Sequence, residues 1–294
     1  MRVLLLGTAA GGGFPQWNCA CRLCTACRAG DPAVPPRTQD CLAISADGAT
    51  WYLVNASPDI RAQVLATPAL APGPGPRDTP LRGALLTDAE LDHTLGLMLL
   101  REGSGLRVWA PPAVLHAVDA GFPIRGAVAR YGDWSWESGE QSGADVPALS
   151  VTAFAVSDKR PKYARESTAE GPWVVAYRIA DPVTGGALVY APCLAAWPDG
   201  FDEFVAGATC VLLDGTFFSA EEMGGTGTSA SAQRAMGHVP IHDSLERITR
   251  HPDIRWLYTH LNNTNPVLDR NSPEYRLVRD AGADVPPDGT ELVF

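Results

Sequence analysis

The chain has 294 residues, 46% of them apolar and 19% charged, a composition typical of a globular protein with a full hydrophobic core. Its formal net charge is −10 and its basic residues form no block, which argues against nucleic acid as a partner. No apolar run approaches the roughly 20 residues that cross a bilayer. The short apolar start at residues 3–6 meets Gly7 at once, so it predicts a buried strand rather than an export signal. We therefore expect one cytoplasmic domain over residues 1–294, with no membrane contact.

Short strands alternate with a few helices along the chain. After the strand at 3–6, Asp47-Gly48 predicts a hairpin between 41–45 and 51–55, and Ser57-Pro58 predicts a helix start. Thr87 to Glu90 fits a capping box for a helix that runs to about Arg101. Further strands are expected at 106–110, 151–156, 174–179, 188–190, 209–213, 254–258 and 291–294, and further helices at 111–120, 243–250 and 272–279. This order favours two sheets covered by helices, with a doubly wound parallel sheet as the alternative.

Four of the seven cysteines, Cys19, Cys21, Cys24 and Cys27, fall within nine residues. A disulfide framework spreads its cysteines along the chain, whereas a tight cluster in a cytosolic protein indicates a metal site. Zinc prefers thiolates at such spacings and takes four ligands in structural sites. Cys19, Cys21 and Cys24 fit around one ion easily, and adding Cys27 from the same tight loop strains the geometry. The sequence therefore predicts a structural Zn²⁺ held by the first three thiolates.

Three apolar segments lead into an aspartate or a histidine. Asp92-His93 follows the run that begins at Leu85, Asp214 ends the strand 209–213, and His260 follows the strand 254–258. Such mixed imidazole and carboxylate sets suit divalent first-row metals. Turn formation is the ordinary explanation for a polar residue at a strand end, but the joint pattern favours ligands. We therefore expect Asp92, His93, His260 and Asp214 at one metal centre.

Other polar residues near these segments are candidates for contacts with a substrate. His238 follows Gly237, where it either contacts substrate or serves the structure. Asn262 and Asn263 lie in the amide-rich loop after His260, and Arg61 is a candidate for a carboxylate contact. Residues 215–237 are rich in Gly, Ser and Thr without a period, which predicts a mobile active-site loop.

Taken together, these residues resemble the metallo-β-lactamase superfamily, whose His-x-His-x-Asp-His motif matches Asp88-Ala89-Glu90-Leu91-Asp92-His93. Within it, the chain is most similar to the branch that acts in the biosynthesis of pyrroloquinoline quinone (PQQ). The likeness extends nearly end to end and includes the strings GGGFPQWNC at 11–19, NASPDIR at 55–61, DGTF at 214–217, MGH at 236–238 and HLNNTNP at 260–266. It implies an α+β fold, the four-layer αββα sandwich, with the metal site at one edge.

The resemblance also implies which ligands are present. In the superfamily, the Asp-His pair, a strand-end Asp and a final His form one metal site, matched here by Asp92, His93, Asp214 and His260. A second site needs the first two motif histidines, which are Asp88 and Glu90 here, and no histidine lies at 151–162, where a third is expected. We therefore expect one reactive metal rather than two. A related phosphodiesterase branch completes its zinc–thiolate site with a His at the position of Asn263, so the fourth zinc ligand stays open between Cys27, Asn263 and water.

The implied function is oxidation of a tyrosine-derived PQQ precursor. Two histidines and one carboxylate with open positions form the centre used by non-haem Fe(II) oxygenases. The hypothesis is an Fe²⁺-dependent hydroxylase with Asp92, His93 and His260 as ligands, and with Asp214 as a further ligand or a base. Zn²⁺ in the same site is the alternative metal. A hydrolase of a PQQ precursor and a carrier of PQQ or its precursor are the alternative functions. Expected partners are the small-molecule or peptide-derived precursor and other proteins of the pathway, and the oligomeric state is open, with a homodimer as one option.

Overall fold

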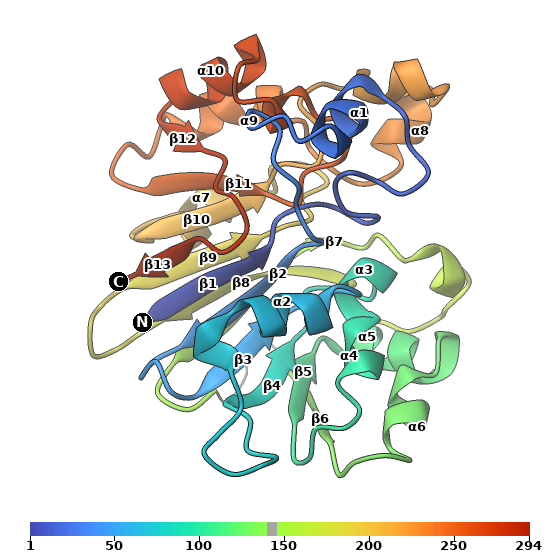
Figure 1. The fold of residues 1–294 in the computed structure, drawn as a ribbon, viewed down its shortest axis with the longest axis vertical. Coiled ribbons are helices and arrows are strands. Elements are labelled where there is room, and N and C mark those ends of the chain that lie inside the picture. Colours follow the sequence, from blue (N-terminus) through green and yellow to red (C-terminus); the bar gives the residue numbers. More distant parts are fainter. Residues whose placement is uncertain (140–145) are drawn as a thin grey trace.

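The computed structural model describes residues 1–139 and 146–294, which form two β-sheets packed face to face with helices on both outer sides (Figure 1). One sheet has the order β13-β1-β2-β3-β4-β5-β6 and the other β12-β11-β10-β9-β8-β7. The strands of the first sheet are β1 (Arg2–Gly7), β2 (Cys41–Ser45), β3 (Trp51–Val54), β4 (Leu81–Leu85), β5 (Arg107–Ala110), β6 (Ser135–Ser138) and β13 (Glu291–Val293). Those of the second are β7 (Ser150–Ser157), β8 (Val174–Ala180), β9 (Ala187–Ala191), β10 (Cys210–Asp214), β11 (Arg255–Thr259) and β12 (Ala283–Asp284).

The helices are short and lie outside the two sheets. In chain order they are α1 (Arg22–Arg28), α2 (Ile60–Ala66), α3 (Leu91–Thr94), α4 (Gly96–Leu99), α5 (Pro112–His116), α6 (Ile124–Val128), α7 (Phe201–Val205), α8 (Ala230–Arg234), α9 (Ile241–Ile248) and α10 (Pro273–Asp280). The 3₁₀ turns are η1 (Pro68–Leu70), η3 (Lys162–Ala164), η4 (Glu222–Thr226) and η5 (Pro266–Leu268), and η2 (Ala117–Gly121) is a π-turn. Among the described residues, no helix has both the length and the apolar character to cross a membrane.

The alternation of side chains along each strand explains the four layers. In β1, Val3 and Leu5 point into the core between the sheets, while Leu4 and Leu6 point to the outer core under α2 and α4–α6. A third core packs α1, α7, α9 and α10 against the outer face of the second sheet. Both faces of both sheets are thus buried, which confirms the predicted αββα sandwich.

Parallel pairing brings the functional strand ends to one edge. Strands β9, β10 and β11 are parallel neighbours, so their carboxyl ends lie side by side. On the other sheet, β3, β4 and β5 are also parallel, and β4 leads into α3. The predicted hairpin at Asp47-Gly48 is confirmed by the antiparallel pairing of β2 with β3.

The capping box predicted at Thr87 was wrong. The segment forms two four-residue helices, α3 and α4, instead of one helix from residue 87 to Arg101. The hydroxyl of Thr87 contacts Asn55 and Asp88, and the side chain of Glu90 pairs with Lys159. Tertiary contacts of these polar side chains replace the expected cap.

The aromatic cluster under β7 allows a test of packing. Phe201 is fully buried, with its ring centroid 5.0 Å from that of Trp197 and 5.8 Å from that of Phe154. We expect Phe201→Ala to lower the free energy of unfolding by about 3–5 kcal/mol, because it removes a buried ring and leaves a cavity. Denaturant unfolding measures this change. Val183→Ala, at a position that is 89% exposed, is the control; an equal loss in both variants would contradict the packing described here.

Candidate metal centre

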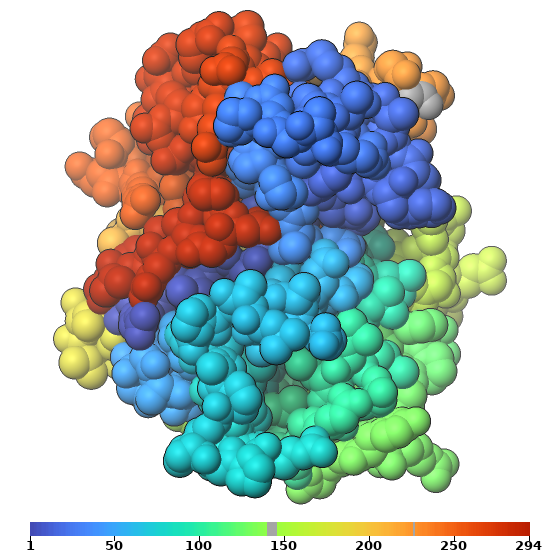
Figure 2. All heavy atoms as spheres, in the orientation of Figure 1, coloured from blue at the N-terminus to red at the C-terminus, as the bar shows by residue number. Residues whose placement is uncertain are grey.

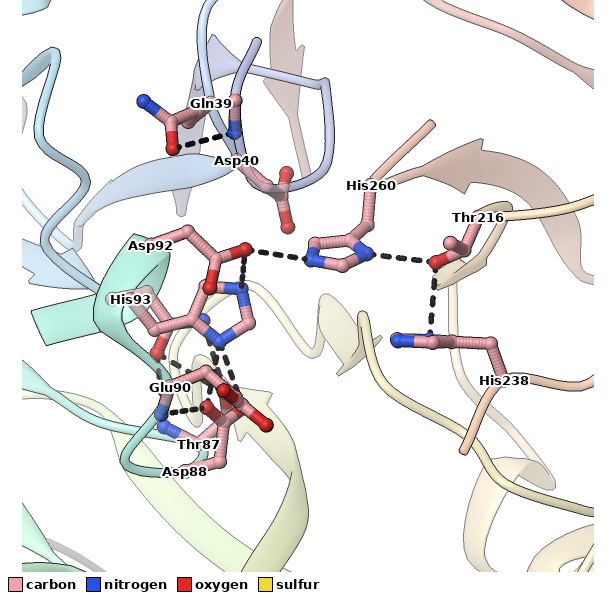
Figure 3. A network of polar contacts seen from close by, with 12 residues as sticks. Gln39, Asp40, Thr87, Asp88, Glu90, Asp92, His93, Thr216, His238 and His260 are labelled. Atoms are coloured by element: carbon pink, nitrogen blue, oxygen red, sulfur yellow. Dashed lines mark hydrogen bonds and ion pairs between the residues drawn. The ribbon is translucent and has the colours of Figure 1, made fainter. Parts of the chain in front are cut away.

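One ring nitrogen of His93 is hydrogen-bonded to a carboxylate, and the other has no hydrogen-bond partner among the described residues. It lies on α3 and is fully buried, and its Nδ1 is 2.8 and 2.9 Å from the two carboxylate oxygens of Asp88 (Figure 3). Burial disfavours a charge there, but the Asp88 and Asp92 carboxylates outweigh it and raise the pKa of His93 to about 10, so without a metal Nε2 carries a proton that a bound cation would displace. A free Nε2 opposite an acid-bound Nδ1 is the arrangement of a metal-binding histidine.

Asp92 and His260 face this free nitrogen. Oδ2 of Asp92 lies 3.9 Å from Nε2 of His93 and 3.3 Å from Nε2 of His260 (Figure 3). Donor atoms that share one ion at about 2.1 Å lie about 3.0–3.4 Å apart, so the three side chains fit one cation after small shifts. A Cβ at Gly11 would lie only 3.1 Å from this Oδ2, which explains why the N-terminal loop is glycine here.

A hydroxyl group fixes the orientation of His260. This residue follows β11 in a left-handed conformation, with φ 57°, and its Nδ1 lies 2.8 Å from Oγ1 of Thr216. The Thr216 hydroxyl in turn donates to Oδ1 of Asp214 at 2.7 Å. Because that single proton goes to the carboxylate, the hydroxyl accepts from Nδ1–H of His260. The lone pair of His260 Nε2 is therefore directed toward Asp92.

Asp214 and His238 lie behind His260 rather than beside His93. Asp214 ends β10 fully buried; its Oδ2 accepts from the backbone N–H of Leu194 and from Nδ1 of His238, both at 2.7 Å. The rings of His238 and His260 stack with centroids 5.3 Å apart. Donor atoms of Asp214, His238 and His260 lie within 4.8 Å of one another, so this group is a second arrangement able to hold an ion. Ligation by Asp214 stays a prediction, and its contacts here are those of a hydrogen-bond acceptor.

The metal-ligand candidates open into a pocket of about 980 Å³. Asp92, His93 and His260 form part of its lining, together with His238 and Asn262. The other predicted substrate contacts lie elsewhere. Arg61 is exposed on α2 and is not part of the lining, and Asn263 is buried against the cysteine cluster. Of the predicted substrate contacts, only Asn262 and His238 thus reach this space.

The position expected for a second metal is filled by an ion pair. Asp88 is bound to His93, and Glu90 pairs with the ammonium of Lys159 at 3.1 Å. Burial alone would lower the pKa of Lys159, but Glu90 raises it above the ordinary value, so the ammonium persists. Cys193, buried just after β9, has its donor atom within 4.8 Å of those of His93 and His260.

Sequence reasoning did not identify Lys159 and Cys193. No motif surrounds Cys193, and only the three-dimensional structure brings it to the centre. A compositional signal existed for Lys159, because the chain contains only two lysines. Asp88 stands where the superfamily motif has a histidine, and its contact with His93 gives it a specific part in orienting a ligand.

The cysteine cluster forms the second candidate metal site. The sulfur atoms of Cys19, Cys21 and Cys24 lie within 4.8 Å of one another; Cys19 and Cys21 precede α1, and Cys24 lies in its first turn. Nδ2 of Asn263 lies 3.2 Å from Cys19 Sγ and 3.5 Å from Cys24 Sγ. Cys27 is buried outside this group. Three thiolates fit a tetrahedral zinc ion, and a 180° turn of the Asn263 amide would present its oxygen as the fourth ligand.

The comparisons with known proteins agree with this fold. Residues 50–261 match the family described as the beta-lactamase superfamily domain. A new diphosphatase of the PhnP family has the same fold, with a TM-score of 0.71 at 17% identity over 100% of this chain and 97% of that one. The chain is therefore a metallo-β-lactamase-fold protein of that superfamily.

More specific relatives cover the full length. The chain is 39% identical to coenzyme PQQ synthesis protein B of Methylobacterium sp. (strain 4-46) over 100% of both chains, and 41% identical to that of Methylobacterium nodulans over 99% of both. The crystal structure of Zn(2+)-bound PqqB from Methylobacterium extorquens superposes with a TM-score of 0.91 at 36% identity over 100% of both chains. The chain belongs to the coenzyme PQQ synthesis protein B family.

The hydroxyl of Thr216 provides a test of the hydrogen-bond chain. We expect Thr216→Val to weaken metal binding at the His260 site by about tenfold or more, because His260 loses the group that fixes its tautomer. Titration of the metal-free protein with a chromophoric chelator as competitor measures the affinity. Thr216→Ser, which keeps the hydroxyl, is the control, and equal affinities in all three proteins would contradict the proposed chain.

The site of Asp92, His93 and His260 shares no residue with the cysteine site, so each can be emptied separately. We expect the protein to bind two equivalents of Zn²⁺, one of which His93→Ala loses and the other of which Cys24→Ser loses. Elemental analysis after dialysis measures the stoichiometry. Loss of both ions in a folded His93→Ala protein, checked by circular dichroism, would contradict two separate sites.

Proposed function

We propose that this protein is a metal-dependent enzyme of PQQ biosynthesis that hydroxylates a tyrosine-derived precursor at a mononuclear centre. The observation that carries the proposal is the convergence of Asp92, His93 and His260 around one point at the pocket. Two imidazoles and one carboxylate leave coordination positions open for a substrate, as in non-haem Fe(II) oxygenases. Full-length relatives named coenzyme PQQ synthesis protein B support the pathway.

The Glu90–Lys159 ion pair supports one metal in place of two. A dinuclear hydrolase centre uses two ions to hold the attacking oxygen. Here Glu90 is neutralised by an ammonium, and Asp88 is bound to His93. These two acids are therefore engaged within the protein. Asp92, His93 and His260 form one compact set, and Asp214 is occupied as a hydrogen-bond acceptor, which favours chemistry at a single ion.

The residues around this centre have distinct parts in the proposed reaction. Asp92, His93 and His260 would hold Fe²⁺, which when bound supplies a redox-active centre for reaction with O₂. Asp88 and Thr216 keep the two imidazoles oriented through their Nδ1 atoms. His238 donates to Asp214, so its other ring nitrogen remains available for a proton or a hydrogen bond. Asn262 lines the pocket with an amide that can orient a phenol.

Hydrolysis is the second candidate, because a crystallised relative at 36% identity carries Zn(2+). Zinc has no redox chemistry and acts by polarising a bond or activating water. The identity of the metal therefore separates the two reactions. A hydrolase consumes its substrate without O₂, whereas hydroxylation takes one oxygen atom from O₂ and requires two electrons from a reductant.

Metal substitution tests the proposed reaction. The metal-free protein is loaded with Fe²⁺ or with Zn²⁺ and given a tyrosine–glutamate adduct, ascorbate as reductant and ¹⁸O₂. We expect mass spectrometry to find ¹⁸O in the product only with Fe²⁺, and His260→Ala to abolish its formation. Turnover at equal rates with Zn²⁺, or without O₂, would contradict the hydroxylase and favour hydrolysis.

A further inference from the structure

The lysines of this chain have an unusual distribution. Of its 23 basic residues, 21 are arginines and only Lys159 and Lys162 are lysines. Both line the pocket at the candidate metal centre, beside Arg160 and Arg165 of the same segment. We call residues 158–165, which connect β7 to β8 and include η3, the basic wall. In a chain with a net charge of −10, four cations are thus gathered on one side of the pocket.

Several contacts fix the basic wall against the residues just before α3, the helix that carries Asp92 and His93. The hydroxyl of Tyr163 donates to the backbone oxygen of Ala89 at 2.6 Å, and Lys159 pairs with the neighbouring Glu90. The guanidinium of Arg160 lies 5.3 Å from the centroid of the Trp173 ring. In Figure 1 the yellow-green segment between β7 and β8 lies beside α3, and it is also visible on the surface in Figure 2. The wall therefore has a defined position relative to Asp92 and His93.

Three cations of the basic wall, Arg160, Lys162 and Arg165, form no ion pair with any residue that the structure describes. The guanidinium of Arg160 is held by the backbone oxygen of Ser167 and by the Trp173 ring, whereas Lys162 and Arg165 are exposed and make no side-chain hydrogen bond within the described residues. The carboxylates of the lining are Glu90, Asp92 and Asp158. Glu90 is paired with Lys159, and Asp92 faces the metal position. The pocket thus retains positive charge on the side of Lys162 and Arg165.

We propose that Lys162 and Arg165 form a carboxylate-binding subsite of the pocket, which holds an acidic end of the substrate while its ring lies at the metal. The proposal rests on the proposed function for the reacting end, which lies at the metal. Arg165 offers a planar fork that matches a carboxylate, and Lys162 a compact ammonium. Lys159 already has a partner, so it positions the wall through Glu90. A pocket of about 980 Å³ can hold a ring at the centre and an acidic part at this wall.

Binding to zinc-loaded protein tests this proposal without turnover. The probe is the tyrosine–glutamate adduct, and isothermal titration calorimetry compares wild type with Lys162→Glu and Arg165→Glu. We expect each reversal to weaken binding about ten- to a hundredfold, because a charged hydrogen bond is replaced by repulsion. Arg130→Glu, an equal charge change at an exposed position outside the pocket lining, should bind as wild type does, and Lys162→Arg should retain most of the affinity.

Changes in the probe identify the group that is bound. An adduct whose carboxylates are converted to carboxamides should bind wild type at least tenfold more weakly, and should lose much less in Lys162→Glu. Inorganic phosphate should compete only weakly. Unchanged affinity of both reversal variants, or competition by phosphate as strong as by the adduct, would overturn the proposed carboxylate site.

The outcome is separable from that of the proposed function. Failure of oxygen insertion with intact, charge-dependent binding would refute the hydroxylase and leave the basic wall as a carboxylate site. Conversely, oxygen insertion with an unchanged KM in Lys162→Glu and Arg165→Glu would support the hydroxylase function. It would refute carboxylate binding by Lys162 and Arg165. Metal content should be equal in all variants, since the wall contributes no ligand.

Discussion

The fixed orientation of two imidazoles is the constraint on which the site depends. Asp88 binds Nδ1 of His93, and Thr216 binds Nδ1 of His260, so both Nε2 atoms are left for one partner beside Asp92. The two hydrogen bonds come from different parts of the chain. The parallel strands of the two sheets bring them together at one edge. Loss of either hydrogen bond allows the imidazole ring to rotate or to change its tautomer. The metal site is thus a property of the hydrogen-bond network as much as of its ligands.

The same network explains how a fold with room for two metals would be limited to the one-metal centre proposed here. The acids at positions 88 and 90 replace the histidines that a second ion needs, and each is used within the protein, Asp88 by His93 and Glu90 by Lys159. The ammonium supplies a fixed positive charge at this position and also ties the basic wall to α3. Asp88, Glu90 and Lys159 thus determine together the charge balance, the orientation of a ligand and the shape of the pocket.

The strand pattern predicted two sheets covered by helices, and the family resemblance predicted the four-layer sandwich that the structure shows. Strand-end polar residues and cysteine spacing are local signals, and the structure does bring Asp92 close to His93 and His260, and Cys19, Cys21 and Cys24 close to one another; metal binding by either group stays a prediction. Sequence reasoning missed what depends on packing. By its local sequence Glu90 fitted a capping box, but its carboxylate forms an ion pair with Lys159, which lies far along the chain. Arg61 was a reasonable anion contact by residue type, yet it lies exposed on α2 outside the pocket lining. Cys193 and the hydroxyl of Thr216 reach the site only through the parallel arrangement of β9, β10 and β11.

Anomalous diffraction at the iron edge is the most direct test of the central claim. Crystals of metal-free protein are soaked with Fe²⁺ under anaerobic conditions. The account predicts one iron peak in the pocket within about 2.3 Å of Asp92 Oδ2, His93 Nε2 and His260 Nε2, and none between Glu90 and Cys193. Two peaks in the pocket, or a single peak coordinated away from His93, would contradict the mononuclear centre.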